Sequence, residues 1–182
     1  MVPIEFFMLT LWGIFAIVGL ARRFPRELGA TIAFVGMLLF FDLVGDRLGG
    51  LTYKVTSTLG FDASRALVTW LVYSAAIAGV VVIAYVGETL TFAGEWPPST
   101  VAGAMVDMTI GLVNGWLVVG TWWCYADKLG YPMQALGWYA APLSPFGQRL
   151  VAATPPAVIP EEYATWIIAG VLLSLLALKF LR

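Results

Sequence analysis

The chain has 182 residues, of which 60% are hydrophobic and 12% are charged, and its mean hydropathy is +0.88. Soluble domains have about 45–50% apolar and about 25% charged residues, so this composition excludes an ordinary soluble enzyme and indicates an integral membrane protein. Ten Lys and Arg against eleven Asp and Glu give a net charge of -1, which provides no global field to attract nucleic acid.

The sequence lacks the residues on which most catalytic, cofactor and metal sites depend. It has no histidine and a single cysteine, Cys124, so it offers neither the usual general base near neutral pH nor a cysteine cluster for a metal. It also has no phosphate-binding loop, dinucleotide fingerprint or serine-based catalytic motif. We therefore expect no enzymatic activity, no metal and no cofactor.

Five apolar segments predict an all-α integral membrane protein that forms a single polytopic domain over 1–182. A bilayer core about 30 Å thick needs about 20 helical residues to cross it. The predicted spans are 4–21, 28–45, 66–87, 104–126 and 162–179. The first two are short, so a re-entrant hairpin that enters the bilayer without crossing it stays an alternative for them.

Three arginines, Arg22, Arg23 and Arg26, lie in the turn between the first two spans. Their simplest role is to fix topology, since short basic loops stay on the cytoplasmic side, and the alternative role is contact with anionic lipid head groups. Lys179 and Arg182 make the C-terminus basic as well. Together these residues predict a multi-pass protein of the bacterial inner membrane with its N-terminus outside and its C-terminus in the cytoplasm.

The stretch after the second span combines turn and helix signals. Gly45 and Gly49 are four residues apart in polar sequence, which predicts a turn there. Apolar residues then recur at helical spacing, which predicts a short amphipathic helix in the membrane interface. These residues are Leu48, Leu51, Val55 and Leu59.

The longest stretch without a predicted span is 127–161. Six prolines exclude a long helix across it, and Trp138, Tyr139 and Phe146 make it too aromatic for a simple disordered linker. We expect it to lie on the membrane surface or against a partner. A further aromatic group stands where the fourth span ends, as in the aromatic belt of a membrane interface. It comprises Trp122, Trp123, Tyr125 and Tyr131.

The fourth span carries the strongest candidate residues. Asp107 allows two interpretations: an interfacial residue near the N-terminus of its own helix, where a negative charge is favourable, or a functional membrane carboxylate for ions or protons. Gly111 and Gly115 form a GxxxG pattern, which lets another helix approach closely. Asn114 beside them can donate and accept hydrogen bonds across such a contact.

The first hairpin resembles the colicin V production protein (CvpA) family. Members commonly have an acidic residue before the first helix, as Glu5 is here, and an Arg-x-Phe-x-Arg-Glu turn into the second helix. Arg22, Phe24, Arg26 and Glu27 occupy those turn positions. The fourth span is also similar to the family's later glycine-rich helix with its acidic residue upstream. In this chain, the positions concerned are Asp107, Gly111 and Gly115.

The chain also departs from that family. Asn114 replaces the usual basic residue between the glycines, Pro25 replaces an apolar residue, and the fifth span is additional. The resemblance implies a small inner-membrane protein that supports toxin production, export or envelope processes, with no established catalytic residues.

Three functions are therefore open. The first is a CvpA-like scaffold or conduit component, and the second is an accessory structural subunit of a larger, energy-converting membrane complex. The third is an ion or proton transporter that uses Asp107. The expected partners are the lipid bilayer and either other membrane subunits or further copies of the chain, with no nucleic acid.

Overall fold

The computed structural model describes residues 4–58, 64–86, 92, 100–137 and 143–181, and within these ranges it contains helices and no strand. Five helical stretches are long and apolar enough to cross a membrane, which confirms the predicted five-span helical fold. The first two have 19 and 22 residues, which at 1.5 Å per residue gives about 29 and about 33 Å. The five are Ile4–Arg22, Phe24–Gly45, Arg65–Val86, Val101–Lys128 and Glu161–Phe180.

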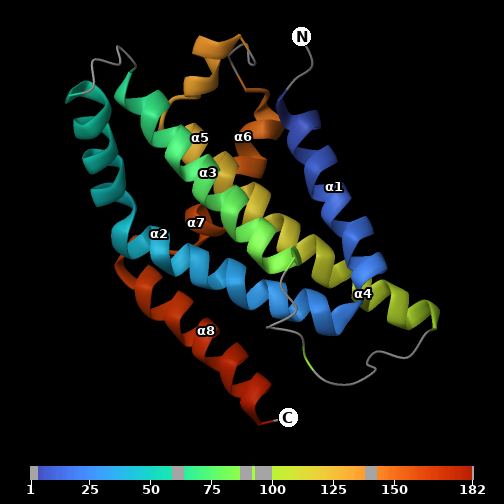
Figure 1. Cartoon of the computed structure of the whole chain (residues 1–182). Helices are drawn as coiled ribbons and strands as arrows, with labels where there is room; N and C mark the ends of the chain where they lie inside the picture. Colours follow the sequence, from blue (N-terminus) through green and yellow to red (C-terminus); the bar gives the residue numbers. More distant parts are fainter. Residues whose placement is uncertain (1–3, 59–63, 87–91, 93–99, 138–142, 182) are drawn as a thin grey trace.

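Helix α1 (Ile4–Arg22) leads into α2 (Phe24–Thr58), which is longer than predicted. The predicted turn at Gly45 and Gly49 is wrong, because α2 is helical through both glycines. Figure 1 shows that the last part of α2 runs in a different direction from its first part. The glycines serve packing instead. A Cβ on Gly45 would lie 2.9 Å from the Tyr73 hydroxyl, and one on Gly49 would lie 2.8 Å from Thr69 Cγ2.

The last part of α2 contains most of the predicted amphipathic helix. Leu48, Leu51 and Val55 are all helical, and Leu51 and Val55 are exposed. Leu59 lies outside the described residues.

The fourth span is one run of helix with a widened turn in its middle. It consists of α4 (Val101–Gly115), a π-helical turn η1 (Trp116–Gly120) and α5 (Thr121–Lys128). Thr100 caps it, because the Thr100 hydroxyl accepts a hydrogen bond of 3.2 Å from the Gly103 N–H. The span therefore begins at Val101, three residues before its predicted start at 104.

The stretch after the fourth span contains short helices, each with proline at or just inside its start. They are η2 (Pro132–Leu136), α6 (Pro145–Ala152) and α7 (Pro155–Val158), and η3 (Glu161–Tyr163) then precedes α8 (Ala164–Phe180). This segment contacts the chain's own fourth span: the Trp116 indole donates to the Ala153 carbonyl at 2.8 Å. Trp138 and Tyr139, part of the aromatic prediction, lie outside the described residues.

The predicted aromatic belt is wrong for the residues that the structure buries. Trp123 and Tyr131 are 3% and 8% exposed, and the Trp123 indole donates to the Tyr131 hydroxyl at 3.0 Å. Trp122 donates to the Ser74 hydroxyl at 2.7 Å. Tyr125 packs on Tyr73 with 4.6 Å between ring centroids. Trp122 and Tyr125 thus join the fourth span to α3 (Arg65–Val86), whereas Trp123 and Tyr131 join the fourth span to the segment that follows it.

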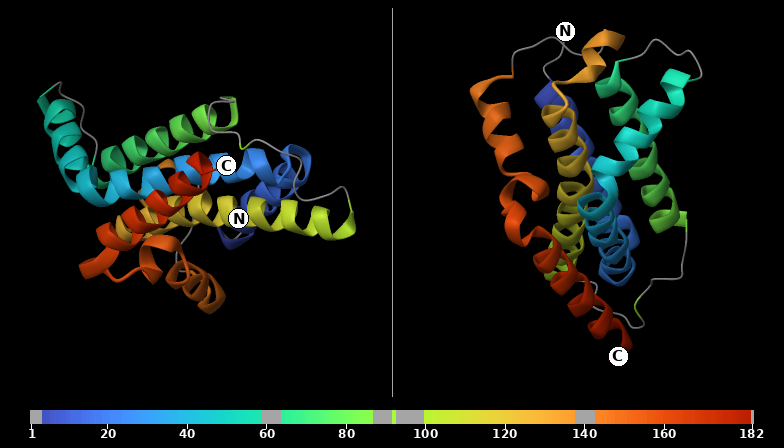
Figure 2. Two further views of the ribbon diagram at one scale, coloured as in Figure 1. Left: turned by 90° about the horizontal axis from the view of Figure 1, so that it is seen from below. Right: turned by 90° about the vertical axis from the view of Figure 1, so that its left-hand side faces the viewer.

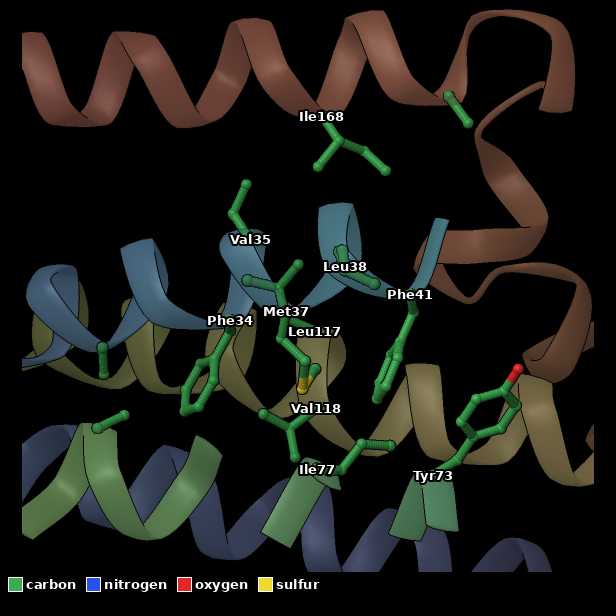
Figure 3. Close-up of a cluster of buried hydrophobic side chains, with 13 residues drawn as sticks. Phe34, Val35, Met37, Leu38, Phe41, Tyr73, Ile77, Leu117, Val118 and Ile168 are labelled. Atoms are coloured by element: carbon green, nitrogen blue, oxygen red, sulfur yellow. The ribbon is translucent and has the colours of Figure 1, made fainter. Parts of the chain in front are cut away.

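The main core lies around the first half of α2. Figure 3 shows Phe34, Leu38 and Phe41 of α2 beside side chains of α3 (Arg65–Val86), the fourth span and α8. Helix α8 lies at the side of the bundle, and its end and the start of α1 lie at opposite ends of the molecule (Figures 1 and 2). Only 11% of the fifth span, which contains α8, is buried, whereas 56% of the second span is buried. Helix α8 therefore offers most of its apolar surface to lipid or to another protein.

Candidate functional site

The turn between α1 and α2 is held by a carboxylate from the fourth span. Arg23 has a positive φ of 68°, which reverses the chain between the two helices. The next residue, Phe24, begins α2, and its N–H donates to Asp107 Oδ1 at 2.7 Å. The first N–H groups of a helix have no partner within it and attract negative charge, so Asp107 caps α2 from another element.

This contact revises the expectation for Asp107. The residue lies in the second turn of α4 and is 6% exposed, and Thr100 caps its own helix. Asp107 is therefore neither at the start of its helix nor open to solvent. Its capping role is exerted on a helix 83 residues away in sequence.

Glu27 is the centre of a buried polar cluster, which we call the Glu27 cluster. Its side chain is fully buried, and it accepts a charged hydrogen bond of 2.9 Å from Arg22 Nε. The same carboxylate accepts from Asn114 Nδ2 at 2.8 Å and from the Tyr85 hydroxyl at 3.2 Å. With Thr31, these residues make up the cluster, which joins the first four spans.

Arg22 faces the protein interior. Its guanidinium donates to the Tyr85 carbonyl at 2.8 Å and lies 4.6 Å from the centroid of the Tyr85 ring. A planar guanidinium has several N–H donors and a cationic face, so it can bind a carboxylate, a carbonyl and an aromatic ring at the same time. The predicted lipid contact therefore does not describe Arg22, whereas Arg23 and Arg26 are exposed on the outside of the turn.

Asn114 connects the fourth span to α2. It is completely buried, and its Nδ2 also donates to the Glu27 carbonyl at 3.0 Å. Its Oδ1 accepts from the Thr31 hydroxyl at 2.7 Å. A side-chain amide can donate and accept hydrogen bonds at once, so it can satisfy polar groups of a neighbouring helix where no water is present.

Gly111 and Gly115 lie against α1 of the same chain. A Cβ on Gly111 would meet the Phe15 carbonyl and would lie 2.9 Å from the Cα of Gly19. A Cβ on Gly115 would lie 2.6 Å from Trp12 Cδ1. The Trp12 indole donates to the Leu112 carbonyl at 2.7 Å, so backbone proximity and a polar bond hold the same pair of helices together.

A second carboxylate of the spans also caps another helix. Glu5 is 5% exposed, and its Oε1 accepts from the Ser144 N–H at 2.9 Å, where Ser144 is the N-cap of α6. Gly147 leaves room for it, because a Cβ there would lie 2.6 Å from the Glu5 Oε1 atom. Glu5 and Asp107 thus act alike, at two different helix starts.

The polar side chains of these sites join helices to one another. Glu27 is neutralised by Arg22, Asp107 and Glu5 are used as caps, and the buried amide of Asn114 is paired on both sides. Across the described ranges no three His, Cys, Asp or Glu side chains come together to hold a metal ion. Cys124 is buried.

Sequence reasoning passed over Glu27, Tyr85 and the capping role of Glu5. Glu27 was assigned only to the turn motif, although it stands at the start of an apolar run, where an unpaired carboxylate would be costly. The signal that could have found it is the pair formed by Arg22 and Glu27, together with a single amide, Asn114, in the middle of another apolar run.

In comparisons with known proteins, no family model, no curated protein and no solved structure matches this chain.

Proposed function

We propose that the protein is a non-catalytic scaffold of a bacterial inner membrane, similar to the CvpA family, which supports toxin production, export or envelope processes. The observation that carries this proposal is the hydrogen bonding of the Glu27 cluster, whose donors all belong to the chain itself. Arg22, Tyr85 and Asn114 all donate to the buried Glu27 carboxylate, so this carboxylate joins helices. A helix bundle with an apolar exterior is suited to a structural role in the membrane, alone or with further copies of the chain.

An accessory subunit of a larger, energy-converting complex is the second candidate. The exposed apolar face of α8 favours it, since Trp166 and Leu173 are 79% and 65% exposed. A transporter that uses Asp107 is the weakest candidate, because that carboxylate is occupied by the Phe24 N–H.

Extraction in a mild detergent, followed by native mass spectrometry, separates the first two functions. A scaffold of the CvpA type is expected alone or as a homo-oligomer, and deletion of its gene should reduce toxin export or weaken the envelope. Stable, stoichiometric recovery with an energy-converting complex would instead establish the subunit function.

Proteoliposomes test the transporter. Under the scaffold proposal, protein-dependent proton or cation flux is absent, and Asp107→Asn changes nothing in the assay. A flux that the wild-type protein supports and Asp107→Asn abolishes would overturn the proposal, provided that the variant keeps the wild-type melting curve.

A further inference from the structure

A cavity of about 730 Å³ lies between α2, α3, α5 and the start of α8, away from the Glu27 cluster. Its size is within the range of about 300–1,000 Å³ that is usual for small-molecule sites. Its apolar wall includes Leu38, Phe41, Ile159 and Ile168. The lining also has four charged side chains, Asp42, Arg65, Lys128 and Glu161.

The positions of the charged residues along the spans show at which depth of the bilayer the cavity lies. Arg65 is the first residue of the third span, Lys128 is the last of the fourth, and Glu161 is the first of the fifth. Asp42 lies three residues before the end of the second span at Gly45. Because successive spans run in opposite directions, all four residues lie toward the same face of the bilayer, where charged head groups meet acyl chains.

The four charged side chains at the mouth of the cavity are exposed and balanced in sign, and they interact only weakly with each other. Lys128 Nζ lies 3.7 Å from Glu161 Oε1, and both side chains are substantially exposed, so this pair is weak. The Asp42 carboxylate accepts from the Thr165 hydroxyl, and Arg65 lies 6.0 Å from the centroid of the Tyr53 ring. Two cations and two anions at the mouth of an apolar pocket are complementary to a ligand that carries both signs of charge.

We propose that this cavity is a binding site for one phospholipid with a zwitterionic head group of the phosphate–amine type. Arg65 and Lys128 receive the phosphate, since both cations are suited to phosphate oxygens. Asp42 and Glu161 receive the amine, and the wall around Leu38 and Ile168 accommodates the start of an acyl chain. The site is independent of the scaffold function and of Asp107.

Two kinds of variant test the site without disturbing the core. The Arg65→Gln/Lys128→Gln double variant removes the phosphate partners, and its control is Arg149→Gln, which removes an exposed cation outside the cavity. Gly50→Leu fills the cavity, because Gly50 lines it and a Cβ there meets only Arg65 Nη2, at 3.9 Å. Its control is Gly79→Leu, at a helical glycine with nothing within 4 Å of the added Cβ.

The measurement is native mass spectrometry of the full chain released from nanodiscs of equal phosphatidylethanolamine and phosphatidylglycerol content. We expect wild type, Arg149→Gln and Gly79→Leu to retain one phosphatidylethanolamine. Retention by the double variant should fall about tenfold, as for the loss of about one strong charged contact. Retention by Gly50→Leu should fall by a similar factor, because the added side chain occupies space that the lipid needs. The proposal is overturned if wild type retains no lipid, if it prefers phosphatidylglycerol, or if Gly50→Leu retains as much lipid as Gly79→Leu.

Discussion

Glu27 shows how one residue can hold four spans together. Moving a carboxylate and a guanidinium out of water costs several kcal/mol for each ion, and attraction between them compensates only where further hydrogen bonds complete the site. Here the Asn114 amide and the Tyr85 hydroxyl supply those bonds. The loss of the Glu27 side chain would therefore affect more than one contact, since Arg22 Nε, Asn114 Nδ2 and the Tyr85 hydroxyl all donate to its carboxylate.

We predict that Glu27→Met lowers the free energy of unfolding by about 3–5 kcal/mol, the range for removal of one partner from a buried pair. Thermal unfolding in detergent, followed by tryptophan fluorescence, measures this loss. The matched control is Glu162→Gln, which changes an exposed carboxylate and should leave the melting temperature unchanged. The Arg22→Met/Glu27→Met double variant should recover part of the loss, because it leaves no unpaired charge. Equal melting temperatures for Glu27→Met and Glu162→Gln would show that the cluster contributes nothing to stability.

At the scale of the elements, α1 and α4 lie so close together that their contact has no room for a side chain at Gly19 or Gly111. Gly111 and Gly19 bring backbone against backbone, and backbone atoms cannot move aside as the end of a flexible side chain can. Tight packing of this kind replaces the hydrophobic effect, which does not drive helices together inside lipid.

Gly111→Ala should therefore lower stability by about 1–3 kcal/mol, the usual cost of overpacking. The control is Gly79→Ala, where the added methyl group meets nothing within 4 Å and should stabilise the helix by up to about 1 kcal/mol. Unfolding in mixtures of mild detergent and sodium dodecyl sulfate, followed by circular dichroism, compares the two variants. If both variants shift stability in the same direction, the close approach of α1 and α4 has no energetic importance.

The local pattern of the sequence predicts the spans well and their contacts less well. Apolar runs locate the five helices, because that signal lies within each segment. The role of Asp107 depends on an N–H group 83 residues away, and the burial of Glu27 depends on spans that begin much later. The polar neighbours of Gly45 and Gly49 predict a turn, whereas the structure has a helix there that lies against Thr69 and Tyr73 of α3.

At the scale of the whole molecule, five spans place the start of α1 and the end of α8 on opposite sides of a membrane, consistent with their positions at opposite ends of the bundle (Figure 2). The basic turn between α1 and α2 predicts that the start of α1 is outside. The same arrangement puts the end of α2 and the start of the fifth span on the outer side.

Single cysteines in a Cys124→Ser background test this topology with a maleimide that cannot cross membranes. We predict that Ser57→Cys and Glu162→Cys, both exposed positions, react in intact spheroplasts. Leu181→Cys, at the opposite end, should react only after the membrane is opened. Reaction of all three positions in intact spheroplasts would contradict the five-span topology, and the reverse pattern would contradict its orientation alone.

The spacing of the Glu27 cluster along the chain has a consequence for biosynthesis. Arg22 and Glu27 are five residues apart, whereas Asn114 follows Glu27 by 87 residues. At about 5–20 residues per second, the ribosome needs about 4–17 seconds to add that interval. During this delay the arginine and the glutamate can already neutralise each other, so the first hairpin can enter the bilayer before its final partners exist. Separating the two charges would therefore impair membrane insertion before it affects the finished protein.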